Sequence, residues 1–330
     1  MNVYPSLAEA GSALRSASIA LGNFDGVHAG HQALFAAAIE HAHARGAKAA
    51  ALTFDPHPAQ ILAPAVAPPR LSSLATKLAL MEQLGLDAVV VHPFTAEFAK
   101  LEPSAFADAL FDQAGVREVV VGFDFTYGRN RAGTIETLTQ AGRAHGAEVT
   151  VVSKVTVDGL PASSTKVREL LLEGKVEATA ALLKRHYALS GAVVHGLARG
   201  RTLGFPTANL QLGEELVPAA GVYATLVEAH ERWWAAAANI GRKPTFGGDE
   251  ALTVEFHLLD FQGDLYGQPL RALFIDRLRG EQRFAGIDAL REQIGRDAQR
   301  ARELAWASKP LVLDPAYALD STAAAPKPHN

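Results

Sequence analysis

The chain has 330 residues, of which 48% are hydrophobic and 20% charged, and its formal net charge is −4. This length predicts about two domains, and the acidic balance argues against broad electrostatic binding of nucleic acid. The sequence has no cysteine, which excludes disulfides, thiolate metal sites and a cysteine nucleophile. No apolar run approaches the ~20 residues that span a bilayer, and the first six residues lack a signal-peptide pattern. We therefore expect a cytoplasmic protein with no membrane partner.

A glycine-rich turn, residues 22–31, follows a short apolar strand predicted over residues 18–21. Helical spacing runs from Gln32 to Arg45, so His28 and His31 fall near a helix N-terminus. Unpaired backbone N–H groups and the helix dipole favour an anion there, and Gly26 and Gly30 permit close backbone approach. Taken alone, two histidines three residues apart more often lie in an ordinary strand-to-helix turn, capped or solvated, than in a phosphate site. The strand, the helix and the glycines instead resemble the His-x-Gly-His signature of the nucleotidyltransferase superfamily, whose pair grips ATP phosphates.

The first half alternates strands and helices. Apolar runs predict strands at 49–54, 88–91, 119–122 and 149–152, and helical spacing appears around 74–85, 103–114 and 133–145. This alternation predicts a parallel, doubly wound α/β sheet of Rossmann-like type. Ligands bind beyond the carboxyl ends of such strands, so the polar segments 23–31, 55–58 and 124–131 are expected to share one crevice.

Two of these segments suit an aromatic heterocycle that carries phosphate. Phe54, His57 and Pro58 belong to a proline-rich connection, for which a stiff extended loop is the simpler interpretation. Asp124 and Phe125 lie in a segment that also holds two arginines between glycines.

A second helix start follows at Ser163–Arg168, where hydroxyls, backbone amides and a guanidinium would meet an anion. A plain helix cap is the alternative. The chain has neither a Walker loop nor a Gly-x-Gly-x-x-Gly motif, so phosphate must be bound by other means.

From about residue 186 the pattern changes to short strands at 188–194, 207–210, 222–227, 235–240, 252–258 and 270–275. These predict a small antiparallel β-barrel. A helix predicted over 284–304 follows, with Leu290, Ile294 and Leu304 as packing positions, and the chain from about 310 is expected to be loosely attached.

Within this half, a basic glycine-rich loop leads into Pro206, Thr207 and Asn209. Its amides could cradle phosphate, and the Thr207 hydroxyl and Asn209 carbonyl offer oxygen ligands for Mg²⁺. A surface hairpin is the alternative for such a loop. Strand alternation places Glu255 on the opposite face from its neighbours, where it is either solvated or available as a general base.

The ordered segments from Gly22 to Gly267 resemble the bifunctional bacterial riboflavin kinase/FMN adenylyltransferase family. The resemblance implies that riboflavin is phosphorylated to FMN in the second half and that FMN is adenylylated to FAD in the first, with ATP and Mg²⁺ in use. It implies catalytic roles for Glu255, His28 and His31, metal ligands at Thr207 and Asn209, and flavin contacts at Phe54, His57, Pro58, Asp124 and Phe125. The ATP and phosphate ligands that it implies are Gly22, Asn23, Phe24, Asp25, Gly26, Gly30, Ser164, Thr165, Arg168, Gly200, Arg201, Gly204 and Pro206.

The resemblance places an adenylyltransferase domain at residues 1–185, a kinase barrel at 186–308 and a tail at 309–330. Many relatives carry a basic residue where this chain has Pro161, which leaves one phosphate contact missing. Two rival interpretations are an adenylyltransferase of another mononucleotide with a non-catalytic barrel, and a flavin-binding sensor. The oligomeric state is open.

Overall fold

The computed structural model describes residues 1–196, 200, 204–244, 250–308 and 311. The chain forms two compact units that divide between Ser164 and Thr165, and each is described by itself. The predicted tail falls outside the described residues, apart from residue 311.

The first unit contains a six-stranded sheet in which every neighbouring pair is parallel. The strand order is β1-β4-β3-β2-β5-β6, so the chain builds outward from β2 in one direction and from β5 in the other. This confirms the predicted doubly wound sheet, and its switch point lies between β2 and β5. The strands are β1 (Asn2–Tyr4), β2 (Ser18–Leu21), β3 (Ala49–Asp55), β4 (Ala88–Pro93), β5 (Glu118–Gly122) and β6 (Glu148–Val152).

The central strands are buried on both faces because helices cover them: Ile19 and Ala20 of β2 and Val119 of β5 are fully buried. Strand β1 was not predicted, because three residues at a sheet edge are too few to show a hydrophobic periodicity. The helices of this unit are α1 (Leu7–Ala10), α2 (Ala29–Ala44), α3 (Pro58–Leu62), α4 (Leu74–Gln83), α5 (Pro103–Asp108) and α6 (Ile135–Ala144). Short helical turns occupy Gly11–Leu14, Pro64–Val66, Phe98–Lys100, Ala109–Gln113 and Arg129–Arg131, and a hairpin pairs β7 (Thr156–Val157) with β8 (Leu160–Pro161).

Two helices, α7 (Ser164–Leu172) and α8 (Val176–Leu183), precede the barrel. Between the two helices lies Gly174, whose φ of +75° is a left-handed conformation that ends a helix.

The second unit is a closed antiparallel barrel, as predicted, and its strand order is β10-β13-β12-β11-β14-β9. Large aromatic side chains fill its interior, and Tyr187, Tyr223, Phe256 and Phe274 are fully buried. The strands are β9 (Tyr187–Val194), β10 (Ala208–Leu210), β11 (Gly221–Ala229), β12 (Arg232–Pro244), β13 (Glu250–Leu258) and β14 (Pro269–Arg279).

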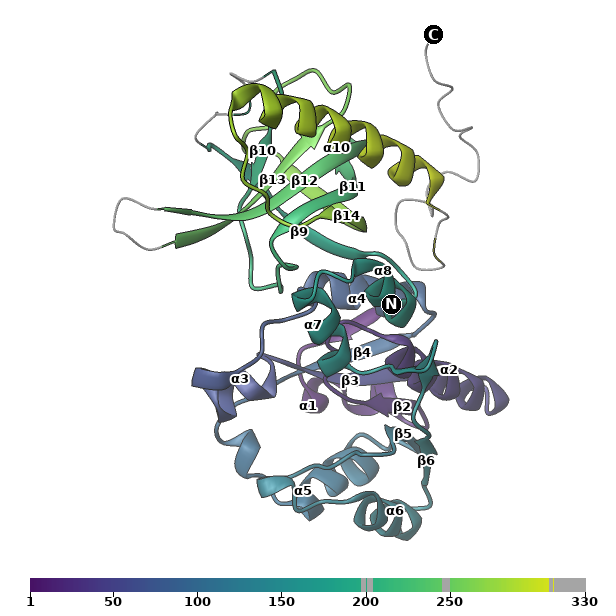
Figure 1. The fold of residues 1–330 in the computed structure, drawn as a ribbon. Helices are drawn as coiled ribbons and strands as arrows, with labels where there is room; N and C mark the ends of the chain where they lie inside the picture. Colours follow the sequence, from purple (N-terminus) through teal and green to yellow (C-terminus); the bar gives the residue numbers. More distant parts are fainter. Residues whose placement is uncertain (197–199, 201–203, 245–249, 309–310, 312–330) are drawn as a thin grey trace. The chain divides into compact units, whose positions relative to one another are not determined.

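Helix α10 (Ile287–Ala307) lies across the outside of the barrel, against β11 and β12 (Figure 1). Its buried residues are Asp297, Ala301 and Ala305, whereas Leu290, Ile294 and Leu304 are only half-buried, so that packing prediction holds in part. Alanines of β11 and β12 line the contact and let the helix approach closely. Asp297 is tolerated there because Arg279 donates to its carboxylate at 3.0 and 2.8 Å.

Candidate active sites

The loop of residues 22–31, called here the phosphate loop, leaves the carboxyl end of β2 beside the switch point. Its backbone is left-handed at Phe24 (φ 50°), Gly26 (φ 82°) and Val27 (φ 45°). A β-branched valine rarely adopts this conformation, and such strain persists only where the surroundings impose it. Strained loops of this kind concentrate at functional sites.

Hydrogen bonds to a neighbouring segment impose this conformation. The buried Asp25 carboxylate accepts from the backbone N–H of Leu71 at 3.0 and 3.2 Å, and the N–H of Gly26 donates to Ser72 Oγ at 3.3 Å. The Gln32 side chain donates to the Val27 carbonyl at 2.9 Å. Asp25 thus holds the loop by its side chain, and the fully buried Phe24 exposes no side chain to a ligand.

The two predicted histidines form a stacked pair at the start of α2. Their ring centroids are 3.6 Å apart at 23°, and the edge of Phe24 packs against His31 at 5.2 Å. Burial lowers the pKa of His31 well below its usual value, and the neighbouring His28 and Lys77 lower it further. The Nδ1 atom of His31 is buried and has no hydrogen-bond partner among the described residues. A neutral imidazole with a spare nitrogen suits binding of an incoming anion, which would raise its pKa.

Close packing explains Gly30. A Cβ at Gly30 would lie 2.9 Å from the Ala162 carbonyl oxygen and 3.1 Å from the His28 ring. Only glycine therefore lets the strand pair before α7 approach the histidines.

The predicted second phosphate segment meets the loop at Ser164, whose hydroxyl donates to the Asp25 carbonyl at 2.9 Å. Thr165 and Arg168 follow it in the first turns of α7. Their roles as phosphate ligands remain predictions.

A cavity of about 890 Å³ opens at the carboxyl ends of the strands. The phosphate loop contributes Gly22 and Asn23 to its wall, whereas His28 and His31 are not among the lining residues. All five predicted flavin residues line it: Phe54, His57, Pro58, Asp124 and Phe125. The segments expected to share one crevice do lie around one cavity.

The segment around Pro58 is not wholly the extended loop that its prolines suggested. His57 caps helix α3, which starts at Pro58: its Nδ1 accepts from the Ala59 N–H at 3.2 Å, and its N–H donates to the Gln60 side chain at 3.1 Å. Proline in the first turn is compatible with a helix, because its missing N–H would be unpaired there anyway.

Three further aromatic residues, Phe94, Phe98 and Phe106, line the cavity and were missed from the sequence. Phe54 contacts Phe94 and Phe98 at centroid distances of 5.5 and 5.6 Å, and Phe106 lies 5.5 Å from Tyr127. Phe94 directly follows β4, so the strand-end rule could have found it. Phe98 and Phe106 come from helical segments and carry no such signal.

Sequence reasoning also missed Lys77 of α4, which is 6% exposed. Its Nζ donates to the Asn23 carbonyl at 2.9 Å and to Thr53 Oγ1 at 3.3 Å. Burial lowers the pKa of Lys77 to about 8. A lone lysine in an amphipathic helix predicts only a solvated face.

In the barrel, strand register places three polar residues side by side. Glu255 of β13 pairs with Asn209 of β10 on one side and with Asn239 of β12 on the other. Directly opposite residues share a face, with Cβ atoms about 5 Å apart. The next row, Ala208, Phe256 and Ala238, is buried in the core. Glu255 and Asn209 are therefore on the outer face, half-buried, and Asn239, which was not predicted, is exposed beside them.

The segment before β10 passes over this face. A Cβ at Gly196 would lie 2.3 Å from the Asn209 amide nitrogen, and one at Gly200 would lie 2.4 Å from the Phe205 carbonyl oxygen and 3.4 Å from Thr207 Oγ1. The Gly200 position therefore requires glycine, because the close atom is backbone, whereas a side chain at Gly196 would displace the Asn209 amide. Gly204 has a φ of 87°, and the exposed Pro206 accepts a hydrogen bond from His257 Nδ1 at 2.8 Å. The predicted phosphate ligand Arg201 lies outside the described residues.

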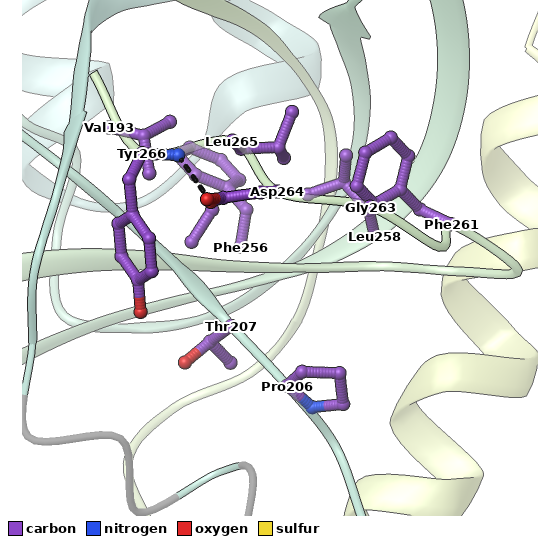
Figure 2. A pocket seen from close by; sticks show the side chains of 11 residues that line it. Val193, Pro206, Thr207, Phe256, Leu258, Phe261, Gly263, Asp264, Leu265 and Tyr266 are labelled. Atoms are coloured by element: carbon purple, nitrogen blue, oxygen red, sulfur yellow. Dashed lines mark hydrogen bonds between the residues drawn. The ribbon is translucent and has the colours of Figure 1, made fainter. Parts of the chain in front are cut away.

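A smaller pocket of about 90 Å³ is lined in part by residues of β10 and β13 (Figure 2). Thr207, Phe256 and Tyr266 line it, and the Tyr266 N–H donates to Asp264 at 2.9 Å. His195 stacks on Tyr266 with centroids 3.7 Å apart. Glu255 is not among the lining residues, because it points to the opposite face from Phe256.

The donor chemistry at Thr207 and Asn209 fits Mg²⁺, which takes hard oxygen ligands and keeps several waters or phosphate oxygens. In the described part of the chain, no three His, Asp or Glu side chains gather into a metal cluster. The described helices include none with the length and apolar character needed to cross a membrane.

Comparisons with known proteins agree with the division of the chain into two units. A sequence model of the FAD synthetase family matches residues 11–166, and one of the riboflavin kinase family matches residues 183–305. Two curated proteins named bifunctional riboflavin kinase/FMN adenylyltransferase are similar to this chain. The one from Pseudomonas fluorescens is 41% identical over 86% of this chain and 92% of that protein. The one from Escherichia coli K12 is 38% identical over 88% of this chain and 94% of that protein.

A solved structure described as a macrolide-efflux protein from Streptococcus pneumoniae matches with a TM-score of 0.82 at 30% identity. It covers 92% of this chain and 99% of that one, so the likeness includes both units. Its description names a different role, while the two family models and the curated relatives name the same pair of flavin-synthesis activities. The chain belongs to the bifunctional riboflavin kinase/FMN adenylyltransferase family.

Proposed function

We infer that the chain carries out two consecutive ATP-dependent steps: riboflavin to FMN in the barrel, then FMN to FAD and pyrophosphate in the parallel-sheet domain. The observation that carries this inference is that each half has its own polar site and matches its own family. A single-activity enzyme with a barrel used only for packing would not need Glu255 in register with Asn209. We keep residues 1–185 and 186–308 as the two domains, and because both steps consume ATP we place the protein in the cytoplasm.

For the kinase step, we assign Glu255 as the general base that accepts the proton of the riboflavin 5′-hydroxyl as its oxygen attacks the ATP γ-phosphate. Support comes from its place on the outer face between two asparagines, one of which is the predicted metal ligand Asn209. Thr207 and Asn209 would hold Mg²⁺, which when bound neutralises charge on the phosphate oxygens. The backbone at Gly200 and Gly204 would contribute to the phosphate site, and Arg201 stays a prediction from the sequence.

For the adenylyl-transfer step, the FMN phosphate attacks the ATP α-phosphate and pyrophosphate leaves. We assign His28 and His31 to stabilise the negative charge that develops on the leaving group. The amides of the phosphate loop assist, with Ser164, Thr165 and Arg168 as further predicted ligands. Pro161 provides no basic contact to the leaving pyrophosphate.

The aromatic cavity suits the isoalloxazine ring of FMN. Its volume of about 890 Å³ falls in the range of small-molecule sites, and Phe54, Phe98 and Phe125 on its wall offer flat apolar faces. Asp124 and Asn23 lie on the same wall and provide polar contacts.

The test is to incubate the purified protein with riboflavin, ATP and Mg²⁺ and to separate FMN from FAD by chromatography. We expect both products. The double variant His28→Ala/His31→Ala should accumulate FMN, and Glu255→Ala should make FAD only when FMN is supplied. Loss of one charge-assisted contact lowers a rate about tenfold to a hundredfold, so a fully active histidine double variant would remove that pair from the mechanism.

A further inference from the structure

Lys77 is a buried cation directly behind the phosphate loop. Its ammonium donates to the Asn23 carbonyl, and the Thr53 hydroxyl donates to the same oxygen at 3.0 Å. Lys77 also reaches the Thr53 oxygen, so the three groups form one closed network. Asn23 lines the large cavity and Lys77 does not. The loop backbone at Asn23 therefore lies between Lys77 and the cavity.

The charges around Lys77 are already engaged with other groups. Asp25 binds the Leu71 N–H, and Asp55 forms an ion pair with Arg70 at 3.0 Å. Asp25 and Asp55 stabilise the ammonium, and Arg70 opposes it. On the loop side, the ammonium is close enough to His31 to oppose its protonation.

A structural role alone does not account for a lysine at this position. A buried ammonium costs free energy that an apolar side chain of similar length would avoid. The Asn23 carbonyl already has a donor in Thr53, so its hydrogen-bonding need is met without Lys77. The charge is therefore retained at a cost to folding, beside a loop that is built to receive an anion.

We propose that Lys77 is a positioning residue for adenylyl transfer: its ammonium fixes the Asn23 carbonyl in the phosphate loop and adds a positive charge behind the two histidines. This inference rests on the proposed assignment of the phosphate loop to that step. It gives the buried side of the loop a cation in a chain that lacks the basic residue at position 161.

The experiment compares Lys77→Met, Lys77→Arg and the matched control Thr53→Val, which removes the other donor to Asn23 but keeps the charge. FMN-to-FAD and riboflavin-to-FMN rates are measured on each full-length variant. Lys77→Met should lower kcat for FAD formation about tenfold to a hundredfold, with a smaller change in KM for FMN. Lys77→Arg should recover most of the rate, Thr53→Val should lose less than about threefold, and FMN formation should stay unchanged in all three.

A second readout is the His31 ring titration, followed by NMR. Removal of the charge in Lys77→Met should raise the pKa of His31, whereas Thr53→Val should not. The proposal is overturned if Lys77→Met keeps FAD formation within twofold, if Thr53→Val loses as much as Lys77→Met, or if Lys77→Arg fails to recover any rate. A wild-type protein that makes FMN but no FAD would instead overturn the proposed function on which this inference rests.

Discussion

Replacement of Lys77 by methionine should stabilise the first unit at neutral pH, even though it impairs catalysis. Burial lowers the pKa of Lys77 from 10.5 to about 8. At about 1.4 kcal/mol per unit, the charged form costs the folded state roughly 3 kcal/mol. Methionine removes this cost but also removes one hydrogen bond to the Asn23 carbonyl, a loss of about 1 kcal/mol. We expect a net gain in the free energy of unfolding of about 2 kcal/mol at pH 7.

The gain has a defined pH dependence. Below pH 8, Lys77 is charged in both the folded and the unfolded chain, so the wild type bears the full cost. Between pH 8 and pH 10.5, the folded state releases the proton that the unfolded state still binds, so wild-type stability rises with pH relative to the variant. The difference of about 2 kcal/mol between the two proteins should therefore shrink across this interval. Above it the wild type should be the more stable by about 1 kcal/mol, because only the lost hydrogen bond remains.

The assay is urea denaturation at pH 7 and pH 10, followed by far-ultraviolet circular dichroism. Tryptophan fluorescence provides an internal control, because Trp233, Trp234 and Trp306 all belong to the second unit. The urea midpoint of the tryptophan fluorescence should be the same in Lys77→Met as in the wild type. Hydrogen exchange in peptides from β2, β3 and α4 locates the change. A variant destabilised by about 2 kcal/mol at pH 7, or a difference that does not respond to pH, would refute the reasoning.

Three further outcomes are expected. Gly30→Ala should lower the rate of FAD formation at least tenfold and leave the rate of FMN formation unchanged, because the added Cβ would lie 2.9 Å from the Ala162 carbonyl oxygen and displace that backbone. Equal loss of both activities would contradict this. Asn239→Asp places a second carboxylate beside Glu255, and the like-charge repulsion should shift the acidic limb of the kinase pH–rate profile to higher pH, whereas Asn239→Ala should leave that limb in place. Asp297→Asn should weaken the bond from Arg279 and destabilise the second unit by about 3 kcal/mol, measured by tryptophan fluorescence in urea; an unchanged midpoint would count against a stabilising role for the pair.

Much of the fold was predictable because it depends on local patterns. Apolar runs of four to seven residues separated by helical periods indicate a parallel sheet, and the five longer strands of that sheet were all found. The same locality made the phosphate loop readable, since a strand, three glycines and two histidines all fall within fourteen residues, Ser18 to His31. The errors occur where the local signal is short or ambiguous, as at the three-residue edge strand β1 and at the proline-rich start of α3.

The candidate sites were only partly predictable. Residues carried by glycine-rich loops and strand ends were nominated from the sequence, because their chemistry and their local position coincide. Asn239 and Glu255 are sixteen positions apart, and only the register of β12 with β13 makes them neighbours. The wall of the aromatic cavity likewise joins residues from separate strands and helices.

The amino-acid sequence by itself determined the two domain types, the order of their elements and the loops that carry phosphate chemistry, since each depends on neighbours along the chain. The tertiary structure alone decided which distant side chains meet: the lysine behind the phosphate loop, the aromatic wall and the row of amides beside the carboxylate. The physical reason is that burial and strand register are set by packing across the whole domain. A lysine on a helix becomes a buried cation only when a strained loop folds over it.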